Sequence, residues 1–229
     1  TGTLDASGKE VGQTGGEVQV LGEWVALLEN AFIDVSGDLG GGTALIGGDY
    51  QGKGIVPTSE KTYFHSTAFV TADALTSGDG GKVILWADDA TYFYGGISAS
   101  GGLQSGNGGF VETSGKQYLD FGGRVDVAAY NGIGGTVLLD PVSITILAGT
   151  DSNSTGFTAG SDIAELFADD SAVVGTVLDP TATTGSFAGI SAGSTIILQA
   201  TDFITVSDAF NLATATGSAN NNLVMQAGG

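Results

Sequence analysis

The sequence has no cysteine, a single histidine, three prolines and no apolar run long enough to cross a bilayer. The absence of cysteine excludes disulfides, thiolate metal sites and cysteine nucleophiles. With His65 alone, a histidine metal cluster or a pair of histidine bases is also excluded. A membrane-spanning helix needs about 18–20 consecutive apolar residues, so we expect no membrane insertion.

Basic residues are scarce as well, since six Lys and Arg stand against 25 Asp and Glu, for a formal net charge of −19. A chain this acidic repels phosphate backbones and anionic lipid surfaces, which argues against nucleic-acid partners. Glycine is abundant, with 40 residues, but it follows no three-residue period, and this excludes collagen. The hydrophobic content of 41% is too high for wholesale disorder.

A diglycine followed by a short apolar stretch recurs five times along the chain. The pairs begin at positions 15, 41, 80, 108 and 134, so three of the four intervals are 26, 28 and 26 residues and the remaining one is 39. Repeats of this length are typical of solenoids, in which each unit buries its apolar face only against its neighbours.

Apolar–polar–apolar triplets alternate with the diglycine units. They are Ile33-Asp34-Val35, Val70-Thr71-Ala72, Ile97-Ser98-Ala99, Val125-Asp126-Val127, Ile144-Thr145-Ile146 and Ile204-Thr205-Val206. A period of two with many β-branched residues indicates short strands, and we expect the glycine-rich breaks to supply positive φ angles at the corners. Such short strands are stable only when stacked, so the sequence predicts an all-β right-handed parallel β-helix of eight to ten coils.

This prediction divides the chain into three parts. Residues 1–148 form coils with an insertion loop at 51–65, residues 149–190 form a loop and short-helix excursion, and residues 191–229 resume the coils. Within the excursion, Asp162 and Glu165 have the spacing of a helix capping box. The alternative is a β-sandwich, which would need antiparallel hairpins between its strands.

Several stretches between about Gly16 and Ile146 resemble the filamentous-haemagglutinin-type exoproteins of bacterial two-partner secretion. They are Val35-Ser36-Gly37 with Gly40-Gly41-Gly42, Ile46-Gly47-Gly48-Asp49-Tyr50-Gln51-Gly52, Gly80-Gly81-Lys82-Val83-Ile84-Leu85-Trp86-Ala87-Asp88, Gly109-Phe110-Val111-Glu112-Thr113-Ser114-Gly115-Lys116, and Gly135-Thr136-Val137-Leu138-Leu139-Asp140-Pro141. The later Ile197-Leu198-Gln199-Ala200 and Val224-Met225-Gln226-Ala227-Gly228-Gly229 resemble ordinary coils of that family. The Asn-Pro-Asn signatures of the family's secretion domain do not occur in this sequence. We therefore interpret the chain as a segment that lies downstream of such a domain.

The resemblance implies a structural and adhesive role rather than an enzyme. The chain would be part of a secreted, extracellular fibre at the bacterial surface, exported through an outer-membrane transporter. Its expected partners are host or matrix glycans or cell-surface proteins, with self-association as a further expectation. Two alternatives remain open: a self-assembling extracellular matrix filament, and a polysaccharide-cleaving β-helix enzyme.

Breaks in the repeat are where we place ligand contacts, because excursions from a regular scaffold commonly carry function. The candidates are Lys53, Lys61, Tyr63 and His65 in or beside the insertion loop, and Trp86, Tyr92 and Tyr94 in the following coil. The competing interpretation is a solvated loop, together with aromatic side chains that pack within the scaffold.

Enzymatic and metal chemistry have weaker support in the sequence. A hydrolase would need paired carboxylates such as Asp88-Asp89 or Asp169-Asp170, but adjacent residues on a strand point to opposite faces. No resident cofactor or metal site is indicated. Acidic turns could bind Ca²⁺, because carboxylate and carbonyl oxygens are its usual ligands. We expect such binding to be weak, because neither the twelve-residue helix–loop–helix calcium loop nor the Gly-Gly-x-Gly-x-Asp repeat occurs in the sequence.

Overall fold

The computed structural model describes residues 2–148, 175–181, 185–218 and 220–228, and these are almost entirely strands and connecting turns. Every pair of neighbouring strands in these ranges is parallel. The predicted all-β class with parallel sheets is therefore confirmed, and the antiparallel pairing that a sandwich requires is not found in the described ranges. The helix predicted from the capping box at Asp162 lies outside the described residues.

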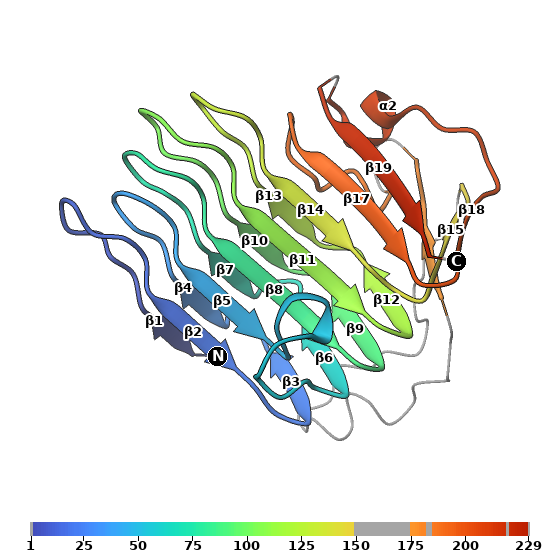
Figure 1. Ribbon diagram of the computed structural model, residues 1–229, viewed down its shortest axis with the longest axis horizontal. Coiled ribbons are helices and arrows are strands. Elements are labelled where there is room, and N and C mark those ends of the chain that lie inside the picture. The colour runs from blue at the N-terminus through green and yellow to red at the C-terminus, as the bar shows by residue number, and fades with distance from the viewer. Residues whose placement is uncertain (1, 149–174, 182–184, 219, 229) are drawn as a thin grey trace.

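The strands form four sheets (Figure 1). The seven-stranded sheet contains, in spatial order, β2 (Glu17–Val20), β5 (Thr43–Ile46), β8 (Lys82–Ala87), β11 (Phe110–Gly115), β14 (Thr136–Leu139), β17 (Thr195–Ala200) and β19 (Asn222–Ala227). The five-stranded sheet contains β1 (Thr3–Asp5), β4 (Phe32–Asp34), β7 (Phe69–Thr71), β10 (Gly96–Ser98) and β13 (Arg124–Asp126). The four-stranded sheet contains β3 (Trp24–Leu27), β6 (Lys61–Phe64), β9 (Ala90–Phe93) and β12 (Tyr118–Phe121), and the three-stranded sheet contains β16 (Thr176–Leu178), β15 (Ser143–Ile146) and β18 (Phe203–Val206).

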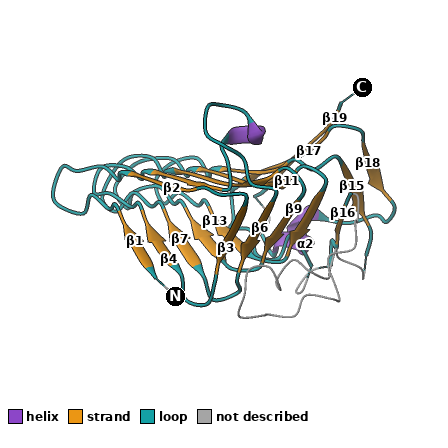
Figure 2. Ribbon diagram, turned by 90° about the horizontal axis from the view of Figure 1, so that it is seen from below, coloured by secondary structure: helices purple, strands orange, loops and turns teal. Residues whose placement is uncertain are grey.

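The chain visits the first three sheets in a fixed order. From β5 in the seven-stranded sheet it passes to β6 in the four-stranded sheet, then to β7 in the five-stranded sheet, and returns to the seven-stranded sheet as β8 beside β5. The same circuit runs through β8, β9, β10 and β11, so that neighbouring strands come from successive repeats (Figures 1 and 2). A short helix, α2 (Leu212–Thr216), interrupts the pattern between β18 and β19.

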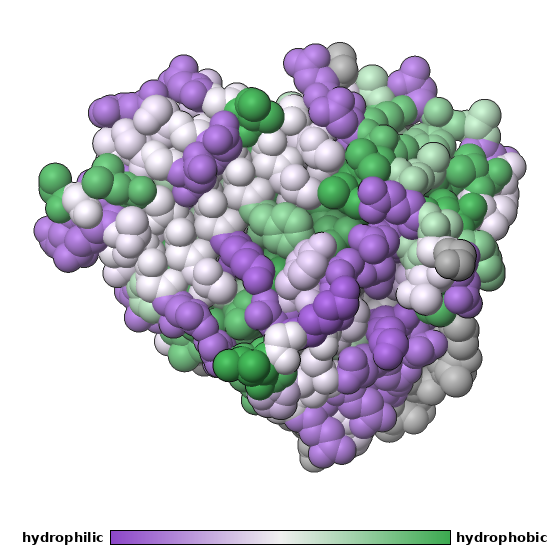
Figure 3. Space-filling view, viewed as in Figure 1, coloured by the Kyte–Doolittle hydropathy of each residue, from purple (hydrophilic) through white to green (hydrophobic). Residues whose placement is uncertain are grey.

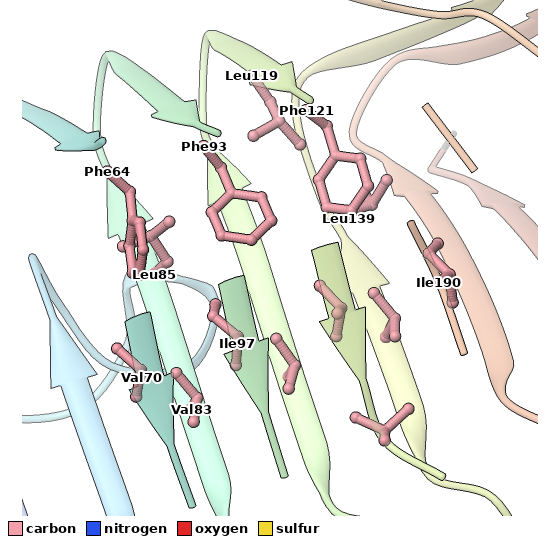
Figure 4. Packing of buried hydrophobic residues seen from close by; sticks show 14 of the residues in the cluster. Phe64, Val70, Val83, Leu85, Phe93, Ile97, Leu119, Phe121, Leu139 and Ile190 are labelled. Atoms are coloured by element: carbon pink, nitrogen blue, oxygen red, sulfur yellow. The ribbon is translucent and has the colours of Figure 1, made fainter. Parts of the chain in front are cut away.

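The core lies between the sheets and is built from equivalent positions of successive repeats. Phe64, Phe93 and Phe121 occupy matching places in β6, β9 and β12, with ring centroids 5.3 Å and then 5.4 Å apart (Figure 4). The seven-stranded and five-stranded sheets contribute rows of inward Val, Ile and Leu to the same cluster. Alternation along each strand therefore sends one face into this core and the other face outward.

The diglycines stand at the entry of the seven-stranded sheet for a steric reason. A Cβ on Gly41 would lie 1.8 Å from the carbonyl oxygen of Ala72, and one on Gly108 would lie 1.8 Å from that of Val127. None of the ten diglycine residues has a positive φ, but the glycine-rich breaks that contain or precede them do supply left-handed positions, for example at Gly78 and Gly106, as expected. The glycines are needed because two backbones approach too closely for a side chain.

Candidate functional site

The insertion between β5 and β6 folds back over the outer face of the seven-stranded sheet (Figures 1 and 2). We call residues 47–60 the strap. It contains a short 3-10 turn, η1 (Tyr50–Gly52), whose preceding residue Asp49 accepts a hydrogen bond from the Tyr50 backbone N–H at 2.7 Å. Lys82 of β8 donates to the same Asp49 carboxylate at 2.7 Å, and this bond contributes most to the lowered pKa of Asp49. The strap is thus attached to the sheet at its first turn.

Trp86 is the apolar support of the strap. Its side chain projects from the outer face of β8 and packs with Leu45, Ile84, Val56 and Phe110, so that only 4% of the residue is exposed. The strap backbone lies directly on the indole, because a Cβ on Gly52 would stand 2.5 Å from Trp86 Cε2. Trp86 therefore supports the strap, and little of its surface is exposed.

Gln51 ties the strap to three further strands. Its backbone N–H lies 3.2 and 3.1 Å from the two carboxylate oxygens of Glu112 on β11. Its side-chain amide nitrogen donates to Asp140 Oδ2 at 2.9 Å, just beyond β14, and to Gln199 Oε1 at 3.2 Å on β17. Gln51 has a φ of 56°, a left-handed conformation that is rare outside glycine and that such a set of contacts can hold in place.

Glu112 is the acidic residue of the site whose pKa is shifted most. It is fully buried beneath the strap, and this burial raises its pKa to about 8, with a smaller contribution from the Asp140 carboxylate. The hydrogen bonds from Gln51 and Ser114 act in the opposite direction but are outweighed. Burial also raises the pKa of Asp140.

Beside the strap, toward the carboxyl ends of the strands, the outer face is hollowed into an open trough of about 580 Å³. We call this hollow the trough. Its polar lining comes from the strap and from successive repeats: Gln51, Lys53, Asp88, Lys116, Asp140, Gln199 and Gln226. Figure 3, which views this face, shows hydrophilic side chains gathered on it. Amides, ammonium groups and carboxylates in one row can donate to and accept from a ligand rich in hydroxyl groups.

The predicted contact residues fall into two groups on different sheets. Lys53 and Trp86 both line the trough, where Lys53 Nζ donates to Gln51 Oε1 at 2.8 Å and Trp86 lies beneath the strap. The other five, Lys61, Tyr63, His65, Tyr92 and Tyr94, belong to the four-stranded sheet or directly follow its strands.

In the second group the aromatic rings pack against one another. The Tyr63 ring lies 6.2 Å from the His65 ring and 6.0 Å from the Tyr94 ring, with Tyr63 and Tyr92 buried. Tyr94 donates from its hydroxyl to Asp120 Oδ2 at 2.7 Å. The structure therefore does not bring the seven candidates together into one site.

Side chains that matter for the trough were not singled out by the sequence. Gln199 and Gln226 are paired across β17 and β19, at the same place in the similar stretches Ile197-Leu198-Gln199-Ala200 and Val224-Met225-Gln226-Ala227. That repeated glutamine is a signal that could have identified them. Glu112, a lone acid on an otherwise uncharged strand, is a second such signal.

The carboxylate pairs considered for catalysis do not converge. Asp88 lines the trough and accepts hydrogen bonds from Thr58 Oγ1 and Trp86 Nε1, whereas Asp89 lies 3.9 Å from Lys61 Nζ in an ion pair. Asp169 and Asp170 lie outside the described residues. Among the residues that the structure places, no group of three or more His, Asp or Glu side chains is arranged to hold a metal ion. The same part of the chain contains no helix with the length and hydropathy of a membrane span.

Comparison of the sequence with protein-family models and with curated proteins gives no match.

Proposed function

We propose that this chain is a right-handed parallel β-helix from a secreted bacterial surface fibre of the filamentous-haemagglutinin type. The parallel sheets, the cyclic order in which the chain visits them and the recurrence of matching side chains between repeats support this proposal. In such a fibre the stacked backbone hydrogen bonds would provide stiffness, and the net charge of −19 would limit lateral association of neighbouring rods.

The binding function is assigned to the trough, with host or matrix glycans as its ligands. The observation that carries this proposal is the anchoring of Gln51, which fixes the strap across β11, β14 and β17 and thereby shapes a rigid polar groove. A preformed groove saves the entropy of ordering its side chains on binding. Parallel strands lie about 4.8 Å apart, so that equivalent amides such as Gln199 and Gln226 present a regular row to a chain of sugars.

Binding to a glycan array, followed by calorimetric titration of the best ligand, tests this assignment. The Gln199→Ala and Gln226→Ala variants should each weaken binding several-fold, and the pair together should abolish measurable binding. Gln104→Ala is the matched control, because this exposed glutamine lies outside the trough. Loss of binding in the control, or full binding by the double variant, would refute the trough as the site.

A further inference from the structure

The outer face of the five-stranded sheet carries an aromatic row that faces away from the core. Phe32 of β4 and Phe69 of β7 are paired in register and stack with ring centroids 6.4 Å apart and an interplanar angle of 22°. Phe69 is 42% exposed although its side chain is large and apolar. Two stacked rings on the outward face of a sheet offer apolar surface on which a ligand can pack.

The next strand leaves room for the Phe69 ring. Gly96 of β10 pairs with Phe69, and a Cβ on this glycine would lie 2.5 Å from Phe69 Cε2. The ring therefore lies over the backbone of β10, and any side chain at position 96 would lift it away. One strand further, Arg124 of β13 pairs with Gly96, so that the phenyl ring and the guanidinium occupy one row with a glycine between them.

Arg124 is the only arginine of the chain, and its side chain is exposed. Within the described ranges its guanidinium has no salt bridge and no hydrogen bond. This lack of a partner is notable in a protein with 25 acidic residues, where a cation is readily paired. The fork of a guanidinium matches a carboxylate in a bidentate geometry.

Phe69 and Arg124 line one groove of about 500 Å³, together with Ser98, Asp126 and Ser191. Its far wall is residues 188–191, which run beside β13: Gly189 accepts a hydrogen bond from the Val125 N–H at 2.9 Å, and Ser191 donates to the Val125 carbonyl at 3.0 Å. The groove is on a different sheet from the trough and shares no residue with it.

We propose that this groove binds a sugar that carries a carboxylate, such as a uronic acid residue of an acidic polysaccharide. The Phe69 ring stacks on the apolar C–H face of the pyranose, and Arg124 receives the carboxylate two strands away, about 10 Å along the sheet at the usual strand spacing. Ser98 and Asp126 lie two residues further along β10 and β13 than Gly96 and Arg124, and therefore on the same outward face. There they meet the sugar hydroxyls. The charge of the ligand distinguishes this groove from the trough, whose lining of three glutamines, two lysines and two aspartates suits neutral sugars.

Calorimetric titration of the wild-type protein with oligogalacturonate, a sulfated oligosaccharide and a neutral oligoglucan tests this inference. We expect oligogalacturonate to bind, Arg124→Gln to weaken that binding at least tenfold, and Arg124→Lys to restore only part of it. Phe69→Ala should also weaken it at least tenfold, because the stacking surface is removed. Equal binding of the sulfated ligand would show that the groove recognises negative charge in general, and would overturn the carboxylate assignment.

A variant of the trough separates this inference from the function proposed above. Lys53→Gln removes a trough cation and should leave oligogalacturonate binding unchanged. If Lys53→Gln abolishes binding while Arg124→Gln does not, the acidic sugar binds in the trough, and the groove on the five-stranded sheet is not a site. Failure of wild-type protein to bind any uronate overturns the inference and leaves neutral-glycan binding in the trough unaffected. Circular dichroism of each variant identifies a loss of folding, in which case the conservative Phe69→Leu replaces Phe69→Ala.

Discussion

Replacement of Glu112 by glutamine should remove most of the pH dependence of stability between pH 4.5 and 8. The native carboxyl is fully buried under the strap, and its pKa is raised from 4.5 to about 8 by that burial. In the unfolded chain the same group titrates near its ordinary value, so within this window the folded protein holds a proton that the unfolded chain has released. Stability contributed by the neutral carboxyl is therefore fully present below about pH 4.5 and declines as the pH rises through 8.

The magnitude follows from the size of the shift. Each pKa unit corresponds to about 1.4 kcal/mol, so the interval from 4.5 to about 8 amounts to a loss of roughly 4–5 kcal/mol of folding free energy in the wild type. Glutamine keeps a side-chain oxygen that can accept from the Gln51 N–H but does not ionise. We expect Glu112→Gln to be markedly more stable than wild type at pH 8 and similar to it at pH 4.5.

Urea denaturation followed by circular dichroism at half-unit pH steps measures this difference directly. Glu10→Gln serves as the control, because Glu10 is exposed and its replacement should leave the slope unchanged. Parallel pH profiles for wild type and Glu112→Gln would refute the burial of Glu112 as the source of the dependence.

Three further perturbations test the strap and the core. Gly52→Ala would place a Cβ 2.5 Å from the Trp86 indole at a φ of 61°. We therefore expect a loss of about 1–3 kcal/mol of folding free energy and greater acrylamide quenching of tryptophan fluorescence. Unchanged quenching would show that the strap does not rest on Trp86. Phe93→Ala should lower the free energy of unfolding in urea by about 3–5 kcal/mol, because it leaves a cavity between Phe64 and Phe121. At the exposed Leu103 the change to alanine should alter stability by less than about 0.5 kcal/mol, and equal effects of the two variants would contradict the packing. Gly41→Ala should destabilise by several kcal/mol, because the new Cβ meets the Ala72 carbonyl at 1.8 Å; a neutral effect in the same assay would argue against the close approach of the two backbones.

The repeat itself could be predicted from the sequence, because local alternation determines which residues face the core. Triplets such as Ile33-Asp34-Val35 and Ile97-Ser98-Ala99 have their apolar members buried, and the diglycines precede five strands of one sheet. Positive φ angles in the glycine-rich breaks, as at Gly78 and Gly106, could also be predicted, whereas the close approach of two backbones that requires the diglycines could not. The longest sheet has seven strands among the described residues, where eight to ten coils are expected, and the strap takes up residues without adding a strand to it.

The site could be predicted only in part. The length of the insertion marked the strap as an excursion, but its direction depends on contacts between residues far apart in the chain, such as Gln51 and Gln199, which are separated by 148 positions. No local period encodes such a contact. Trp86 illustrates the same dependence on distant residues. It belongs to β8, but the strap that covers it follows β5.

The most direct test of the account is a map of the backbone amides that respond when a glycan binds. Two-dimensional NMR of the labelled 22.7 kDa chain, titrated with the neutral ligand selected from the array, provides that map. We expect the chemical-shift changes to cluster at Gln51, Lys53, Lys116, Gln199 and Gln226, around the trough. Saturable shifts confined to another face, with the trough amides unchanged, would contradict the assignment of glycan binding to the groove that the strap creates.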